Sequence, residues 1–120
     1  MLIAYWIVAG LSAVLFFAAG LLKVVRPLPA LAASGMGWVD DYTPTSVRLI
    51  GLAEVVGALG LVLPVLTGIA PILSPVAALA LAVIMVGAIV THVRRSEPPV
   101  AAVLLALALA SAVLGFLVVL

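Results

Sequence analysis

The sequence has no cysteine and only one histidine, His92. Without thiols the chain cannot form a disulfide bond, a thiolate metal site, an iron–sulfur cluster or a thiol–disulfide relay of its own. One histidine cannot supply a bis-histidine haem or a three-histidine zinc site within one chain. We therefore expect no ligated metal and no cofactor of its own. A quinone, which needs no such ligands, remains open as a bound molecule.

Charge is almost as scarce. Five Lys and Arg and four Asp and Glu make up 8% of the 120 residues, against about 25% in an ordinary soluble domain. Hydrophobic residues make up 68% of the chain. A net charge of +1 offers no surface to neutralise phosphates, which excludes a nucleic-acid binder. So few charges cannot cover a water-facing surface, and we predict an integral protein of the lipid bilayer.

The apolar residues gather in four stretches, each close to the roughly 20 residues that a helix needs to cross a bilayer. The stretches cover approximately residues 2–24, 45–64, 75–93 and 99–120. We predict an all-α integral membrane protein, in which residues 1–120 form a single four-transmembrane-helix bundle.

Proline and its neighbours mark the predicted ends of the helices. Thr43 is a candidate N-cap for the second span, with Pro44 at the first helical position, where a missing N–H costs nothing. Ser74 and Pro75 repeat this pattern for the third span, and Pro64 is the predicted end of the second.

The connection over residues of about 27–43 is too short and too apolar for a domain of its own. It contains Trp38 and Tyr42, and these residue types are favoured at membrane interfaces. We expect an interfacial segment in which Asp40 and Asp41 point to water.

The basic residues are distributed asymmetrically. All five lie in the two segments, span ends included, that four alternating spans place on one side, and residues 65–74 on the other side contain none. The positive-inside rule then places the long loop and the 92–99 turn in the cytoplasm and both termini outside. No basic segment precedes the first apolar stretch, so we expect a retained anchor and not a signal peptide. The five residues are Lys23, Arg26, Arg48, Arg94 and Arg95.

Glu54 is the most informative residue. It follows Pro44 by ten positions, which places it roughly 15 Å into the helix, near the bilayer midplane. An acid at that depth costs at least about 2.5–3.5 kcal/mol unless it is paired or protonated. We therefore expect Glu54 to face the interior of the bundle.

Helical side chains lean toward the N-terminus of their own helix. Glu54 therefore leans toward the cytoplasm, whereas Lys23 and His92, on helices that run the other way, lean toward Glu54. We predict a polar cluster of Lys23, Glu54 and His92 with Arg48 at its mouth. A purely structural Lys23–Glu54 pair, and basic residues that only anchor the topology by snorkelling, remain as alternatives.

Small residues on two of the spans predict close helix packing. Such contacts would form within the bundle or, for the fourth span, with a second copy in a homodimer. The residues are Gly51, Gly57 and Ala58 on the second span, and Ala108, Ser111 and Gly115 on the fourth.

Three motifs together resemble a known family. The first span ends Ala-Gly-Leu-Leu-Lys at residue 23, the second reads Arg48-x-x-Gly51-x-x-Glu54-x-x-Gly57-x-x-Gly60, and the third closes on Gly87-Ala-Ile-Val-Thr-His92-Val-Arg-Arg-Ser-Glu97. The chain resembles the DoxX-like family of small four-helix bacterial membrane proteins. The family's recurrent polar positions would correspond to Lys23, Arg48, Glu54, His92 and Arg94. The resemblance implies a component of the bacterial cytoplasmic membrane linked to redox or sulfur metabolism.

Three functions follow as hypotheses. The first is an accessory or anchoring subunit of a membrane redox assembly, without enzymatic activity of its own, whose basic cytoplasmic face (Arg26, Arg94 and Arg95) receives a soluble redox partner. The second is a module that binds a quinone or another lipid-soluble molecule and uses the Glu54 cluster for proton exchange. The third is a proton-coupled efflux protein. Against the third stands the absence of an acid from the first span, where small multidrug transporters carry theirs.

Overall fold

The computed structural model describes residues 2–33, 36–96 and 101–120, and this part of the chain folds into four long helices and two short ones. All four long helices are long and apolar enough to cross a membrane. The prediction of an all-α bundle with four spans is therefore confirmed, and the chain is a multi-pass membrane protein. The long helices are α1 (Leu2–Val25), α3 (Pro44–Thr67), α4 (Leu73–Arg94) and α5 (Ala101–Val119), and the short ones are α2 (Leu28–Ala33) and the 3-10 helix η1 (Gly37–Asp41).

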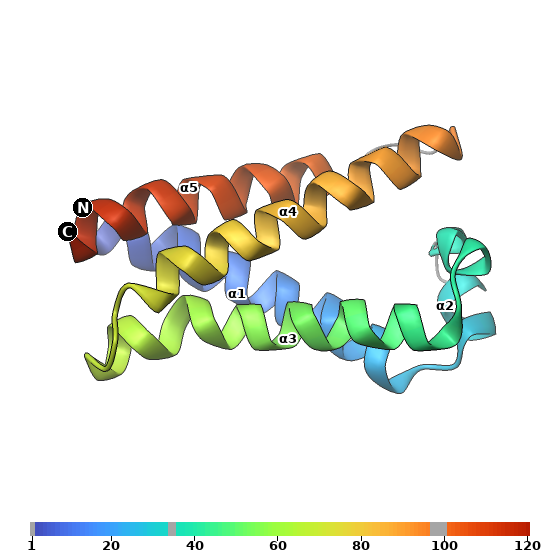
Figure 1. The fold of residues 1–120 in the computed structure, drawn as a ribbon, viewed down its shortest axis with the longest axis horizontal. Coiled ribbons are helices and arrows are strands. Elements are labelled where there is room, and N and C mark those ends of the chain that lie inside the picture. The colour runs from blue at the N-terminus through green and yellow to red at the C-terminus, as the bar shows by residue number, and fades with distance from the viewer. Residues whose placement is uncertain (1, 34–35, 97–100) are drawn as a thin grey trace.

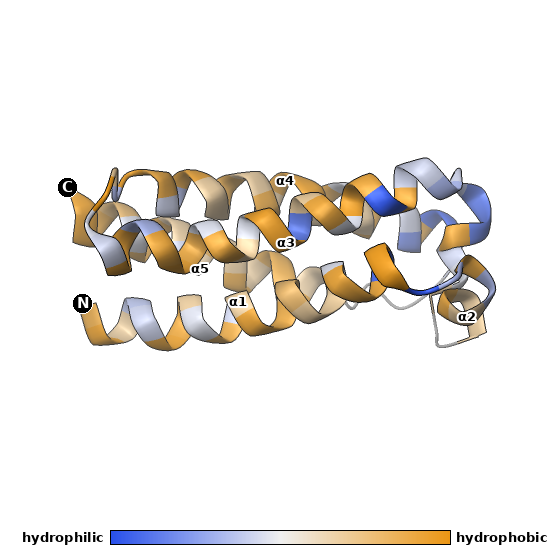
Figure 2. Ribbon diagram, turned by 90° about the horizontal axis from the view of Figure 1, so that it is seen from below, coloured by the Kyte–Doolittle hydropathy of each residue, from blue (hydrophilic) through white to orange (hydrophobic). Residues whose placement is uncertain are grey.

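The four long helices alternate in direction and form a ring of antiparallel neighbours. Helix α1 packs against α3 and α5, and α4 packs against the same two helices from the other side. Both chain termini lie at one end of the bundle, and α2 and η1 lie at the other (Figure 1). Hydrophobic residues run along all four spans, whereas hydrophilic ones gather at the end that carries α2 (Figure 2).

The outward faces of the helices are apolar, as a lipid environment requires. Ile3 is 78% exposed and Val83 is 72% exposed, whereas Phe16, Leu61 and Leu81 are fully buried between the helices. A soluble bundle could not leave large aliphatic side chains of this kind on its surface. The same residues are at no disadvantage against lipid tails.

Helix α3 begins as predicted. The Thr43 hydroxyl oxygen accepts a hydrogen bond from the Ser46 amide at 3.1 Å, and Pro44 occupies the first helical position. This cap satisfies one of the amides that have no partner within the helix.

The predicted end of this helix at Pro64 is wrong. Helix α3 continues through Pro64 to Thr67 and stops at Gly68, whose φ of 73° is left-handed and whose amide donates to the Pro64 carbonyl at 3.0 Å. Proline removes one hydrogen bond to the preceding turn but leaves its own carbonyl able to cap the end. The glycine, and not the proline, ends the helix.

The predicted cap of the next helix at Ser74 is also wrong. Helix α4 begins at Leu73, its N-cap residue Ile72 makes no side-chain cap, and Ser74 and Pro75 lie buried in the first turn. The tight turn before the helix already orders the backbone, because the Leu73 amide donates to the Ala70 carbonyl at 3.0 Å. Pro75 still occupies a position where its missing N–H costs nothing.

The connection between α1 and α3 packs on the end of the bundle. Leu31 of α2 and Val39 of η1 are fully buried against Val47 of α3, whereas Asp40 and Asp41 are exposed. The position of this segment at a membrane interface stays a prediction. The predicted start of the fourth span at residue 99 lies outside the described residues.

Candidate functional site

Helices α1 and α3 cross at a point where each contributes a glycine. A β-carbon on Gly20 would lie 2.5 Å from the Gly51 carbonyl oxygen, and one on Gly51 would lie 2.6 Å from the Lys23 β-carbon. Real β-carbon contacts essentially never fall below 3.0 Å, so this backbone approach requires glycine on both helices. Because the helices are antiparallel, the crossing places Lys23 of α1 against Gly51, and Glu54 of α3 against Gly20.

The two residues that face these glycines, Lys23 and Glu54, form the ion pair of the site. The Lys23 ammonium donates a hydrogen bond to Glu54 Oε1, and the two groups form a salt bridge. The Lys23 side chain is 10% exposed and the Glu54 side chain 1%. Breaking a pair at this depth strands a charge in a medium of low dielectric, so each residue depends on the other.

Two features distinguish this pair from a simple helix–helix bridge. The Lys23 Nζ lies 5.5 Å from the centroid of the Trp38 ring, within cation–π range. The second carboxylate oxygen of Glu54, Oε2, is buried without a hydrogen-bond partner in the described part of the chain. A buried acceptor left unsatisfied is costly, so this oxygen calls for an explanation beyond the helix–helix bridge.

Arg48 holds the end of α1 against the start of α3. Its guanidinium donates to the backbone carbonyls of Lys23 and Arg26, in the last turn of α1 and just beyond it. These carbonyls have no partner within the helix, and a cation is favourable beside them because they carry the negative end of the helix dipole. Arg48 thus fixes the position of Lys23 through its backbone.

A cavity of about 610 Å³ lies against the ion pair. Its wall is largely aliphatic, including Met85 and Leu104, and both Lys23 and Glu54 contribute to it. The rim on α4 includes Val83 and Gly87, which are exposed on the outer surface of the bundle. The cavity therefore opens sideways between α3 and α4, on the face that the apolar residues assign to lipid.

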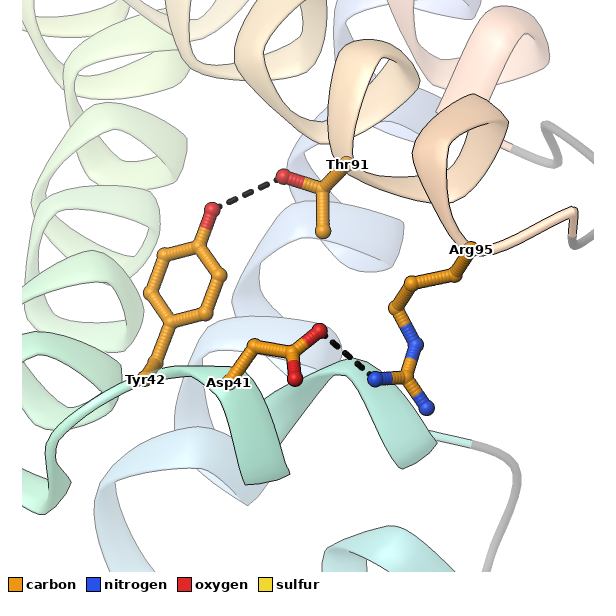
Figure 3. Close-up of polar contacts among 4 residues, drawn as sticks. All are labelled: Asp41, Tyr42, Thr91 and Arg95. Carbon is orange, nitrogen blue, oxygen red and sulfur yellow. Dashed lines mark hydrogen bonds and ion pairs between the residues drawn. The ribbon is translucent and has the colours of Figure 1, made fainter.

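Two side-chain bridges join η1 to the end of α4 at this cavity (Figure 3). The Tyr42 hydroxyl hydrogen-bonds to the Thr91 hydroxyl at 2.8 Å, and Thr91 in turn donates to the Gly87 carbonyl. Arg95 forms an ion pair with Asp41 at 2.6 Å. Because Tyr42 and Thr91 also line the cavity, these bridges close it on the side of η1.

The structure brings two residues of the predicted cluster into direct contact and places the other two close to them. Lys23 and Glu54 are in contact, and His92 lies on the wall of the same cavity. Arg48 contacts the backbone of α1 and not the carboxylate.

Of the three arginines in the predicted basic face, Arg26 and Arg94 are exposed and Arg95 binds Asp41. Glu97 of the third motif lies outside the described residues.

The predicted small residues all lie between helices of the same bundle. The Ser111 hydroxyl is 3.3 Å from that of Ser12, and a β-carbon on Gly115 would lie 3.1 Å from Pro75. A β-carbon on Gly57 would meet Leu81 at 2.7 Å. The remaining residues of this set, Ala58 and Ala108, belong to the hydrophobic core.

Sequence reasoning missed Gly20 and the role of Trp38 beside the lysine. A signal for Gly20 was present, since Gly20 precedes Lys23 by three residues as Gly51 precedes Glu54. Where two antiparallel helices cross at a pair of such glycines, each charged residue lies against the glycine of the other helix. No comparable signal in the sequence places Trp38, because its contact depends on the path of the connection.

The site has no set of metal ligands. Within residues 2–33, 36–96 and 101–120, no three His, Cys, Asp or Glu side chains lie close enough to hold an ion. The largely apolar cavity offers one ammonium and one carboxylate, which form a pair, and the His92 imidazole lies on the same wall. Such a site can bind and orient a lipid-soluble molecule through hydrogen bonds, and it can move a proton between its two groups.

Of three comparisons with known proteins, one identified a family. A search of curated proteins and a search of solved structures both gave no match. The model of the DoxX-like family matches residues 7–116, which include all three motifs, the glycine crossing and the ion pair. The chain belongs to the DoxX-like family.

Proposed function

We propose that this protein binds a lipid-soluble molecule with a polar head, of the quinone class, in the cavity beside Lys23 and Glu54. The observation that carries the proposal is a cavity of about 610 Å³ that opens toward lipid and reaches a buried ion pair. Binding sites for small molecules have volumes of about 300–1,000 Å³ and combine apolar walls with a few polar groups. The tail of the ligand would lie among the aliphatic side chains, and its head would meet the lysine.

The direction of access supports a ligand from the bilayer. The openings at Val83 and Gly87 face the lipid side, whereas Tyr42 and its bridge to Thr91 cover the side of η1. A water-soluble substrate would need the opposite arrangement. The unpaired Oε2 of Glu54 further supports a role for this carboxylate beyond holding two helices together.

The packing favours a binding site over a transporter. Proton-coupled efflux requires access to the acid from both faces of the membrane in turn. Fully buried Phe16, Leu61 and Leu81 fill the bundle on the side of Glu54 that faces the termini. A cavity closed at this end supports binding without passage.

A second candidate is an accessory or anchoring subunit of a membrane redox assembly in the cell membrane. Exposed Arg26 and Arg94 favour it, because two exposed guanidinium groups at one end of a lipid-embedded bundle suit an acidic soluble partner. We expect both termini on the outside and these arginines in the cytoplasm. The two candidates are compatible if the bound quinone exchanges electrons with that partner.

The first test is chemical. The protein is purified in mild detergent, its bound lipids and quinones are extracted, and co-purifying proteins are identified by mass spectrometry. A stoichiometric quinone supports the cavity proposal, and a stoichiometric soluble enzyme supports the anchoring role.

The second test blocks the opening with a matched pair of variants. A β-carbon would meet nothing within 4 Å at either Gly87 or Gly10, but only Gly87 lines the cavity. Gly87→Leu should therefore deplete the bound molecule at least about tenfold, and Gly10→Leu should leave it unchanged. Equal occupancy in both variants would show that no ligand uses this opening.

A further inference from the structure

We infer that this cavity selects a neutral head that accepts a hydrogen bond, such as a quinone carbonyl, and rejects the carboxylate of a fatty acid. The inference rests on the proposed function and specifies its ligand chemistry. It comes from the exposure of the two charged groups at the cavity and from their summed charge.

The group offered to a ligand is the ammonium of Lys23. Both residues line the cavity, but the Lys23 side chain is 10% exposed and that of Glu54 only 1%, so the ammonium is the more accessible of the two groups. An ammonium has three N–H donors and no acceptor. One donor goes to Glu54 Oε1, which leaves two for a ligand oxygen in the cavity. The head must therefore carry an acceptor.

The summed charge of the pair then decides between acceptors. Lys23 and Glu54 together are neutral, and the cavity around them is mostly aliphatic. A neutral carbonyl can accept from Lys23 without changing that balance. A carboxylate would place a second anion beside Glu54 in a medium of low dielectric, where an uncompensated charge is very costly.

The other charged groups near the cavity are bound elsewhere, and the His92 imidazole on its wall is counted as neutral in the summed charge. The Arg48 guanidinium is half-buried and bound to two backbone carbonyls at the end of α1. Asp41 and Arg95 neutralise each other beyond η1. Trp38 presents a ring to the ammonium and carries no charge. The Lys23–Glu54 pair therefore determines the charge beside a ligand head in the cavity.

Removing one charge should therefore reverse the preference. Glu54→Gln keeps the size and hydrogen-bonding capacity of the side chain but leaves Lys23 as an unbalanced cation. A carboxylate head then restores neutrality, as Glu54 did before. A structural role for the pair would lower stability in this variant but would not create affinity for an acid.

Trp38 provides the measurement, since it lies on the cavity wall beside Lys23. The chain has two tryptophans, and Trp6→Phe leaves Trp38 as the sole tryptophan, which is excited selectively over the tyrosines. The protein is reconstituted in lipid nanodiscs and titrated with decylbenzoquinone, which quenches tryptophan, and then with decanoic acid, which restores fluorescence by displacement. The complementary Trp38→Phe protein, which reports from Trp6, controls for quenching by quinone dissolved in lipid.

We expect saturable quenching by decylbenzoquinone in the Trp6→Phe protein and at least about tenfold weaker binding of decanoic acid. Glu54→Gln should bind decanoic acid at least about tenfold more tightly than its parent does. Equal affinities in the parent, or no gain in the variant, would overturn the inference while leaving the cavity as a binding site. Quenching that never saturates in the parent would refute the proposed function, and the inference with it.

A second variant covers the case in which Glu54→Gln does not fold. Replacing both members of the pair in Lys23→Met/Glu54→Leu removes the buried charges together, a change that proteins often tolerate well. This variant should bind quinone and acid with less than about threefold difference, because neither charge remains to discriminate between them. A retained tenfold preference for the quinone would refute the assignment of selectivity to this pair.

Discussion

The glycine crossing of α1 and α3 makes a quantitative prediction about stability. In Gly20→Ala the new β-carbon would lie 2.5 Å from the Gly51 carbonyl oxygen and 3.0 Å from the Glu54 β-carbon. The first contact involves backbone, which cannot rotate away as a side chain can. The helices must therefore separate by about half an ångström to reach the 3.0 Å limit of real contacts.

The cost follows from two opposing effects. Overpacking a close-packed interface typically costs about 1–3 kcal/mol, and replacing glycine by alanine in a helix returns up to about 1 kcal/mol. Gly20→Ala should lower the free energy of unfolding by about 1–2 kcal/mol. Gly10→Ala is the matched control, because a β-carbon there meets nothing within 4 Å, and it should be neutral or more stable by up to about 1 kcal/mol.

The assay is unfolding in mixed micelles with increasing sodium dodecyl sulfate, followed by far-ultraviolet circular dichroism. The two variants should lie on opposite sides of the parent chain or, at the least, differ by more than about 1 kcal/mol. If Gly20→Ala were as stable as Gly10→Ala, the close approach of α1 and α3 would be refuted, and with it the geometry that brings Lys23 to Glu54.

Three further predictions concern the ion pair, the bridge to η1 and the topology. Lys23→Met and Glu54→Gln should each lower the free energy of unfolding by about 3–5 kcal/mol, and the double variant should lose clearly less than their sum; strict additivity in the same micelle titration would show that the residues do not interact. Tyr42→Phe and Thr91→Val should each cost about 1 kcal/mol, and the double variant no more than one of them; a doubled loss would place the two hydroxyls apart. A reporter that is active only in the cytoplasm should be silent when fused after Leu120, and activity there would invert the predicted topology.

Much of the fold and the central contact of the site could be predicted because the bilayer imposes simple rules. Length and hydropathy are enough to identify four spans. The placement of Glu54 opposite Lys23 needed only the depth of each residue, the alternating direction of the spans and the lean of helical side chains. Intramembrane charges leave few solutions, because each must find a partner within reach.

The remainder depended on geometry that a sequence does not carry. The sequence predicts a helix end at Pro64, but the Pro64 carbonyl and Gly68 close a further turn beyond it. It predicts a cap at Ser74, but the preceding turn already orders the backbone there. The contact of Tyr42 with Thr91 joins residues 49 positions apart in the chain and depends on where η1 settles. The cavity is a space between side chains, and its shape follows only once every neighbour is placed.

The solid packing of the half that carries the termini has an electrical consequence. A cell that stores energy as a proton gradient cannot admit a membrane protein with a continuous file of polar groups from face to face. Beyond Glu54 the chain places fully buried Phe16, Leu61 and Leu81. Among the described residues, the fully buried hydroxyls of this half belong to Tyr5, Ser12, Ser74 and Ser111, and that of Tyr5 donates to the Leu61 carbonyl. An aliphatic and aromatic layer of this kind conducts neither ions nor protons, because it offers no site for a charge or for a water chain. Under the proposed function, any proton exchange by Glu54 would be confined to the side of this layer that carries α2.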